Sequence, residues 1–200
     1  MPSIHNPKSL STTMTDFIRY CNTLSSLDAM AAEDLEKSIF VRSYTKGDLI
    51  LKQGDTCRYL YFINDGLVKV YSYKNDKEFI MRFFSENALF SVFDSFVTQT
   101  ASKYIIEVLE DAKITFVGRD ALDDLCQRHH CIERLFRIVA TDTLVRMTKR
   151  INEMLEEEAS ERYTRFLIEN RPIIQRLSLG DMAKYLGITP QSLSRIRNVI

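Results

Sequence analysis

The sequence predicts an α+β protein in which a small antiparallel β-roll or jelly roll is followed by a long helix and a C-terminal helix-turn-helix. Three observations predict this fold. Short apolar runs broken by Gly, Asn and Asp fill residues 40–117, and a helical stripe of apolar side chains follows over residues 132–154. The final segment, residues 178–200, has the caps and the tight turn of two short crossing helices.

Composition limits the class of protein. A chain of 200 residues with 45% apolar side chains can bury one large core or two small ones. No run approaches the roughly 20 apolar residues that span a bilayer, and the N-terminal segment lacks the apolar core of a signal peptide, so we expect a cytoplasmic protein without a membrane partner. The four cysteines are scattered and include no C-x-x-C pair, which indicates reduced structural thiols.

The formal net charge of zero hides a separation of charge along the chain. Residues 1–158 carry 20 Lys and Arg against 24 Asp and Glu, whereas residues 159–200 carry 7 against 3, so the two parts hold −4 and +4. No acidic side chain follows Asp181. A basic C-terminal segment favours contact with phosphates.

The first part of the chain is predicted as a flexible arm over residues 1–14, followed by a helix from near Thr15 and a second helix over residues 29–39. Turn residues then recur every 8 to 12 residues or so, with no helix between them, which is typical of antiparallel strands. These turns are Gly47-Asp48, Gly54-Asp55, Asn64-Asp65-Gly66 and Asn75-Asp76. Residues 85–103 interrupt the rhythm and predict a short helix and a loop, where a ligand is expected.

A short helix is expected near residues 120–128, and a long one begins at about Ile132. Its apolar side chains recur mostly in steps of 3 and 4, over a length that little else in the sequence can cover. We therefore expect this helix to pair with its twin in a homodimer. A helix packed only on its own β-roll remains the alternative. The predicted dimer contacts are Ile132, Leu135, Val139, Met147, Ile151 and Met154.

The C-terminal segment has a physical marker at each helix end. Ser178 can cap a first helix with Asp181 at the third helical position, and Gly187 can supply the left-handed residue that ends this helix. Thr189-Pro190 is a cap followed by proline at the first helical position of a second helix. Ala183 is small where the two helices cross. These features predict a helix-turn-helix.

The exposed side of the second helix has the chemistry of a major-groove reader. Arg195 is suited to guanine and Gln191 to adenine, and Ser194 lies on the same side. Thr189, Ser192 and Arg197 are suited to phosphates. We therefore expect double-stranded DNA as a partner, and an ordinary surface αα-hairpin is the alternative.

Four motifs carry a resemblance to a known family: KGDLILKQGD, YLYFINDGLVKVYSY, SERYTRFL and DMAKYLGITPQSLSRIR. With them the chain resembles the shorter members of the CRP/FNR superfamily of bacterial regulators. The resemblance implies a cyclic-nucleotide-binding-like effector domain over residues 15–130, a dimerisation helix over 131–158 and a winged DNA-binding domain over 159–200. It also implies a two-fold symmetric DNA site and a role in transcription, often through contact with RNA polymerase. Whether the wing is complete stays open.

The resemblance fails where the effector is expected. Family members that bind cyclic AMP have a Gly-Glu pair for the ribose and an Arg-Ser pair for the phosphate, and here Ser91-Val92 and Ala101-Ser102 stand in their places. Losing a charge-assisted hydrogen bond costs about 1.5 to 3 kcal/mol, so we expect no tight binding of cyclic AMP. Lys103 is a partial substitute for the arginine. The effector, if any, is an unknown small molecule, and its expected pocket is Ser91, Val92, Ala101, Ser102, Lys103 and Thr148.

Other classes of function find little support. His129-His130-Cys131 could hold a metal or haem, but a solvated helix start is the favoured interpretation, because no other His lies nearby in sequence. One N-terminal cysteine, Cys21, does not suit an iron-sulfur cluster. We expect no metal and no cofactor. No strand contains histidine, and no phosphate loop, G-x-S-x-G or H-E-x-x-H occurs, which argues against an enzyme. The alternative function is a sensor or scaffold whose helix-turn-helix contacts proteins.

Overall fold

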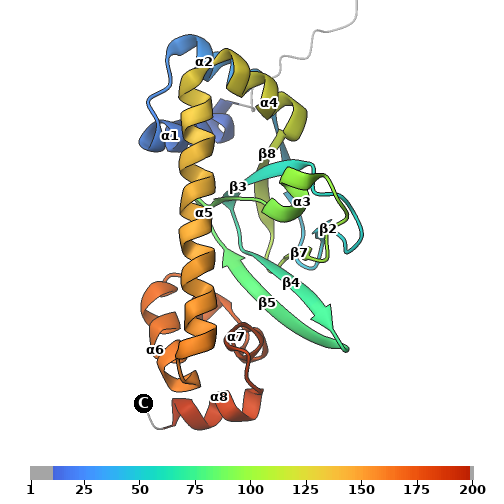
Figure 1. Cartoon of the computed structure of the whole chain (residues 1–200), viewed down its shortest axis with the longest axis vertical. Helices are drawn as coiled ribbons and strands as arrows, with labels where there is room; N and C mark the ends of the chain where they lie inside the picture. Colours follow the sequence, from blue (N-terminus) through green and yellow to red (C-terminus); the bar gives the residue numbers. More distant parts are fainter. Residues whose placement is uncertain (1–10, 199–200) are drawn as a thin grey trace, which may run out of the picture.

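The computed structural model describes residues 11–198. A β-roll lies beside one long helix, and shorter helices lie at both ends of that helix (Figure 1). The roll contains β1 (Ile39–Tyr44), β2 (Leu49–Leu51), β3 (Tyr59–Asp65), β4 (Val68–Lys74), β5 (Lys77–Phe84), β6 (Leu89–Phe90), β7 (Ile105–Val108) and β8 (Ala112–Gly118). The helices are α1 (Ser11–Leu24), α2 (Ala29–Lys37), α3 (Phe93–Thr98), α4 (Arg119–Arg128), α5 (His130–Glu156), α6 (Ala159–Glu169), the 3-10 helix η1 (Ile174–Arg176), α7 (Leu179–Leu186) and α8 (Pro190–Arg197).

The strands form two four-stranded sheets, in the orders β1-β8-β3-β6 and β2-β7-β4-β5, and the strand pairs within both are antiparallel. The predicted turns are confirmed by their backbone, because Gly47, Gly54, Gly66, Asn75 and Asp76 all have positive φ. Gly66 has a further reason to be glycine, since a Cβ atom there would lie 2.6 Å from Cβ of Ala112. The predicted fold class, an α+β protein with an antiparallel roll, is confirmed.

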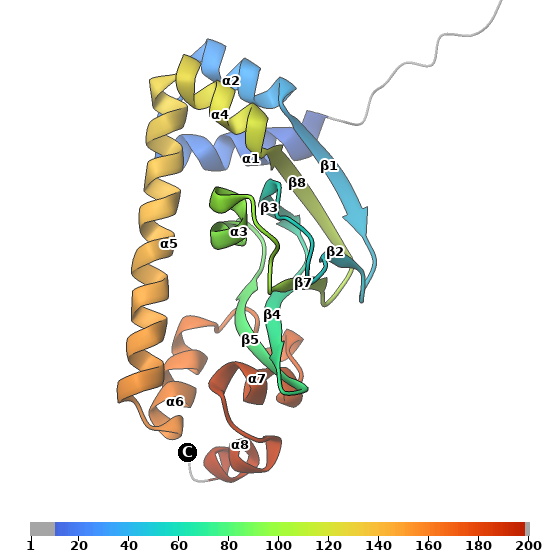
Figure 2. The same ribbon diagram turned by 45° about the vertical axis from the view of Figure 1, so that its right-hand side comes forward.

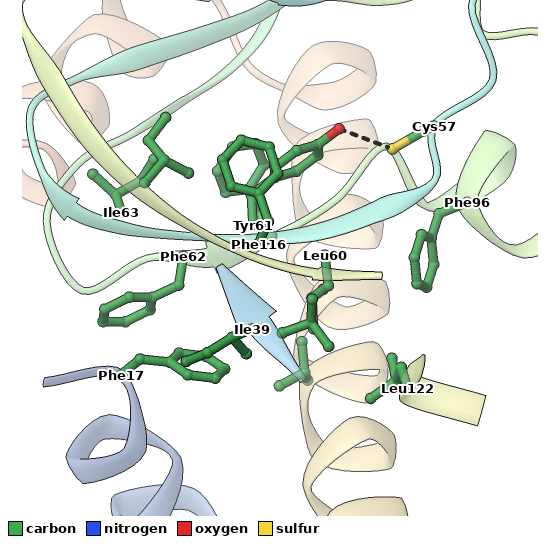
Figure 3. Close-up of a cluster of buried hydrophobic side chains, with 14 of the residues drawn as sticks. Phe17, Ile39, Cys57, Leu60, Tyr61, Phe62, Ile63, Phe96, Phe116 and Leu122 are labelled. Atoms are coloured by element: carbon green, nitrogen blue, oxygen red, sulfur yellow. Dashed lines mark hydrogen bonds between the residues drawn. The ribbon is translucent and has the colours of Figure 1, made fainter. Parts of the chain in front are cut away.

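The core of the roll combines aliphatic side chains with a group of packed aromatic rings (Figure 3). Phe17 of α1 packs on Phe62 of β3 with ring centroids 5.3 Å apart, and this contact fixes the N-terminal helix on the roll. Inside the roll, Tyr61 packs on Phe116 of β8, and its hydroxyl lies 3.6 Å from Sγ of Cys57. Aromatic pairs add about 0.5 to 1.5 kcal/mol each to the free energy of area burial.

The long helix α5 corrects part of the predicted dimer interface. Figure 2 shows α5 passing beside the roll and then beside α6. In its first half, Ile132, Leu135 and Val139 are at most 6% exposed and belong to the core of their own protomer, so they do not line an interface with a second copy. In its second half, Met147, Ile151 and Met154 are exposed. The helical periodicity of the sequence indicates an apolar stripe along α5, but it does not indicate whether the same chain or a second copy packs against that stripe.

Some boundaries differ from those expected. Helix α1 begins at Ser11, before the expected Thr15, and α2 ends at Lys37. The remainder of the predicted arm, residues 1–10, lies outside the described residues, as does the position of a wing after α8. The short helix expected within residues 85–103 is α3. Across residues 11–198, no helix is both long enough and apolar enough to cross a membrane.

Candidate nucleic-acid interface

Helices α7 and α8 form the predicted helix-turn-helix, and their ends confirm the predicted caps. Ser178 Oγ accepts a hydrogen bond from the Asp181 N–H at 3.0 Å, and Gly187 ends α7 with φ of 71°. Thr189 Oγ1 accepts from the Ser192 N–H at 3.1 Å, and Pro190 is the first residue of α8. The local sequence therefore sets both helices and the turn between them.

The crossing of the two helices buries a small apolar cluster. Ala183, Leu186 and Leu193 are completely buried, which confirms the close approach expected at Ala183. A Cβ atom at Gly187 would lie 3.0 Å from Cε of Met154, so the turn also packs tightly against the end of α5. This packing fixes the crossing angle and leaves the opposite side of α8 in solvent.

The solvent side of α8 holds the predicted DNA contacts. Thr189, Gln191, Ser194, Arg195 and Arg197 are exposed, whereas Ser192 is half-buried with its N–H used by the cap. Helix α8 contains two arginines and no acidic residue. Among the described residues, neither arginine is engaged in an ion pair. Together they form an accessible basic and polar surface.

Helix α7 lies on the outer face of the β4–β5 hairpin, and a buried ionic group joins the two. The ammonium of Lys69 on β4 is 2.9 Å from Glu78 on β5, 3.4 Å from Glu107 on β7 and 3.6 Å from Asp181 on α7, and its side chain is only 8% exposed. Lys184 on α7 reaches Glu78 at 2.6 Å. Burial alone lowers the pKa of Lys69, but the hydrogen bond to Glu78 and the three carboxylate charges raise it overall.

A second ionic contact joins η1 to the roll. Arg176 donates to both oxygens of Glu86 at 2.8 and 3.0 Å, and it also pairs with Glu110. Glu86 in addition accepts from the Gly66 N–H at 3.1 Å. The hydrogen bond from Arg176 lowers the pKa of Glu86, which favours the ionised carboxylate in the folded protein.

Apolar contacts surround these ions. Phe83 on β5 lies 5.6 Å from the ring of Tyr185 on α7 and 6.3 Å from Phe166 on α6, measured between centroids. From the other side, Arg150 of α5 stacks over Tyr185 at 4.0 Å and donates to its carbonyl, and Arg162 donates to the Leu186 carbonyl at 3.1 and 3.2 Å. These arginines satisfy the C-terminal carbonyls of α7.

In the region expected to hold an effector, the two serines use their hydroxyl groups within the roll. Ser91 Oγ donates to the Tyr59 carbonyl at 2.9 Å, Val92 is buried, and Ser102 Oγ donates to the Tyr104 carbonyl at 3.0 Å. Ala101 and Lys103 are exposed, and the Lys103 ammonium lies over the Tyr104 ring at 5.0 Å. The segment thus offers one cation, on its surface.

Thr148 is placed elsewhere. It lines an open cleft of about 520 Å³ between α5 and α6, and none of the other five expected pocket residues lines this cleft. The three residues of the suspected metal motif also have different partners: His129 Nε2 is 2.8 Å from Asp34, His130 is exposed beside Glu133, and Cys131 is near Asp28. Among the described residues, no group of three or more His, Cys, Asp or Glu is arranged to hold a metal ion.

Sequence reasoning missed the ionic residues that hold α7 and η1 on the roll. Lys69, Glu78, Glu86 and Glu107 lie on strands or turns far from Asp181 and Arg176 in sequence, so no local spacing connects them. The one available signal is Lys69 itself, a charged residue within the apolar run LVKVY. A charge at such a position is expected to have a buried partner.

Comparison with known proteins gives three kinds of match. A family model described as the cyclic nucleotide-binding domain matches residues 41–129. The anaerobic regulatory protein of Haemophilus influenzae is 25% identical over an alignment of 162 residues. The match covers 76% of this chain and 63% of that protein, so the chain spans less than two thirds of this relative.

Two solved structures share the fold. FixK2 from Bradyrhizobium japonicum superposes with a TM-score of 0.70 at 22% identity, covering 80% of this chain and 83% of the other. A protein from Eubacterium rectale assigned to the CRP/FNR family superposes with a TM-score of 0.68 at 14% identity, covering 86% and 83%.

The fold and the matches define a cyclic nucleotide-binding-type roll joined by a long helix to a helix-turn-helix domain. The chain matches the cyclic nucleotide-binding domain over residues 41–129 and shares the fold of these two solved structures, which agrees with the resemblance to CRP/FNR regulators found in its sequence motifs.

Proposed function

We propose that this protein is a cytoplasmic, dimeric transcription regulator that binds a two-fold symmetric site in double-stranded DNA and has no catalytic activity. The observation that carries the proposal is the outer surface of α8. Two arginines without ion-pair partners among the described residues, two serines, a threonine and a glutamine lie there on a helix whose other side is anchored in a packed core. Fixed, unpaired basic and amide groups are what base-edge recognition requires.

Each exposed residue has a role in the proposed complex. Arg195 forks onto guanine O6 and N7, and Gln191 pairs with adenine. Thr189, Ser192 and Arg197 hold phosphates on either side, and the N-terminus of α8 adds its partial positive charge. Ser194 lies between them on the base-facing side. Phosphate contacts set the position of the helix, whereas Arg195 and Gln191 read sequence.

The second half of α5 supports a homodimer. Leu144, Thr148, Ile151 and Leu155 follow each other in steps of 4, 3 and 4, and the three apolar members are 66%, 58% and 79% exposed. This spacing is typical of the seam of a coiled coil. A second copy that buries this seam would bring two α8 helices into symmetric positions, as a palindromic DNA site requires.

The effector domain is proposed not to bind cyclic AMP tightly. The positions of the nucleotide contacts are held by Ser91, Val92, Ala101 and Ser102, whose hydrogen bonds are made within the roll, and Lys103 points to Tyr104. A different small molecule remains the expected effector. Regulation of transcription would follow from contact with RNA polymerase or from exclusion of it.

The decisive experiment is selection of bound sequences from random duplex DNA, with the full chain and with Arg195→Ala. We expect a two-fold symmetric consensus that relaxes at one position per half-site in the variant, with a loss of about 1 to 3 kcal/mol. Arg171→Ala is the matched control, because Arg171 is equally exposed but lies outside α7 and α8.

Three outcomes of this selection contradict the proposal. Enrichment without symmetry would contradict the dimer, and equal loss from both arginine variants would contradict base reading by Arg195. No enrichment at low salt would instead favour a helix-turn-helix that contacts proteins. The salt dependence of binding separates DNA contact from protein contact. Each phosphate contact contributes a slope of about −0.9 in log K against log salt, and docking to a protein is not expected to show so steep a slope.

A further inference from the structure

The most extensive feature not used by the proposed function is the contact between the helix-turn-helix and the β4–β5 hairpin. Figure 2 shows this hairpin extending from the roll to α7. Here we define the docking network as Lys69, Glu78, Glu107, Asp181 and Lys184, together with Arg176, Glu86 and Glu110. The network connects three strands of one sheet to both η1 and α7.

The chemistry of the docking network favours one orientation over others. The guanidinium of Arg176 donates hydrogen bonds to two carboxylates. Because a guanidinium is planar and its donors have fixed directions, a small shift of either carboxylate weakens these hydrogen bonds. Lys69 is nearly buried among three carboxylates. Separation of α7 from the hairpin would remove Asp181 from Lys69 and Lys184 from Glu78. Apolar packing already opposes movement of α7, and the directional hydrogen bonds of these ion pairs add a preferred orientation to it.

The network leaves the reading surface free. Its C-terminal members lie on η1 and α7, while Gln191, Ser194 and Arg195 of α8 stay exposed. Docking therefore fixes where α8 points without covering it. In a dimer joined through α5, the direction of each α8 relative to its own roll determines the spacing and rotation between the two reading helices.

We propose that Arg176 and Lys184 are positioning residues, which hold α8 at one orientation so that the dimer accepts one half-site spacing. This proposal rests on the proposed DNA-binding function. Each base pair added between half-sites moves the second site by about 3.4 Å and rotates it by roughly 34°, so a rigidly docked α8 pair is sensitive to a single step.

The test uses the full chain, with Arg176→Gln and Lys184→Gln. Binding is measured to synthetic duplexes that carry the selected half-sites with spacers shortened or lengthened by one and two base pairs. We expect the wild type to lose about tenfold in affinity per base pair away from the optimum, and the variants to lose about threefold or less, with a lower maximum. Arg176→Lys, which keeps the charge but not the fork, is expected to give an intermediate profile.

Amide hydrogen exchange, measured without DNA, tests the contact between α7 and the β4–β5 hairpin directly. Amides of α7 and β5 are expected to exchange faster in Arg176→Gln and Lys184→Gln, while those of α1 and α2 are unchanged. Arg128→Gln is the matched control, because Arg128 pairs with Asp34 and Asp124 at the opposite end of the molecule. It is expected to alter neither the spacing profile nor exchange in α7.

The outcomes separate this inference from the function on which it rests. Variants with faster exchange in α7 but the sharp spacing profile of the wild type overturn the positioning role and leave the DNA-binding function standing. Variants that bind every spacer more tightly than the wild type also overturn it, because docking would then oppose DNA binding. If the wild type enriches no DNA at all, the proposed function fails, and the positioning role fails with it, even when exchange shows that the contact exists.

Discussion

Residues 130–139 of α5 pack against the roll of the same chain, whereas residues 144–155 carry apolar side chains into solvent and contact the helix-turn-helix through Arg150. In the first half, Leu135 is 6% exposed within an apolar core. In the second half, Ile151 is 58% exposed, and Arg150 contacts Tyr185. One half of this helix is thus held by apolar packing. The other half is held by polar contacts and leaves an apolar surface exposed to solvent.

This difference has a physical consequence. Close-packed apolar contacts are lost all at once when they separate, and they resist small shifts. Hydrogen bonds from long arginine side chains can re-form after small movements, and exposed apolar area can be buried by a second chain. The roll end of α5 therefore acts as a fixed base, and the other end carries both the proposed dimer contact and the contact that positions the helix-turn-helix.

The largest effect is expected in the packed half. Leu135→Ala is expected to lower the free energy of unfolding by about 2 to 5 kcal/mol, because the roll cannot collapse onto the missing side chain. Chemical denaturation measures this loss. Leu155→Ala, at a position 79% exposed, is expected to change it by less than about 0.5 kcal/mol in protein dilute enough to be monomeric. Equal losses at both positions would contradict the distinction between the two halves.

The exposed half is expected to control association instead. Ile151→Asp places a charge from each copy into the proposed seam and is expected to weaken the dimer by about 100-fold or more, while the protomer keeps its fold. Analytical ultracentrifugation and circular dichroism measure the two quantities. Met30→Asp, at a residue 68% exposed on α2, is the control and should leave association unchanged. A dimer that tolerates Asp at position 151 would place the interface elsewhere.

Whether the sequence predicted a feature depended on how far apart in sequence the interacting residues are. The caps at Ser178 and Thr189 and the turn at Gly187 were predictable because they rest on residues within a few positions of each other. The class of the roll was predictable from its short apolar runs and turns, although strands such as β1 and β8 pair across a long stretch of sequence. The division of the α5 stripe was not predictable, because helical periodicity is the same whether a face packs on its own domain or on a second copy. Ile132, Leu135 and Val139 were therefore assigned to the wrong partner.

The docking of α7 on the roll was also beyond the sequence, for a related reason. Lys69 and Asp181 are more than one hundred positions apart, and nothing local in either segment specifies that they meet. The effector segment shows the intermediate case. Its departures at Ser91 and Ala101 were visible by resemblance, but only the structure shows that Ser91 and Ser102 use their hydroxyls within the roll.

The smallest effect is expected from the hydrogen-bonded contact between α5 and α7. Arg150→Met keeps the apolar stem but removes the stacking on Tyr185, the hydrogen bond to its carbonyl and the ion pair with Glu153, which Arg165 also approaches. We expect a net loss of about 1 kcal/mol at this partly buried site. Amides of α7 are therefore expected to exchange about fivefold faster, with little change in global unfolding. Arg146→Met, one turn away and paired only with Asp142 of the same helix, provides the control and should leave α7 unchanged. If both variants loosened α7 equally, general weakening of α5 would explain the result, and Arg150 would have no specific part in holding the helix-turn-helix.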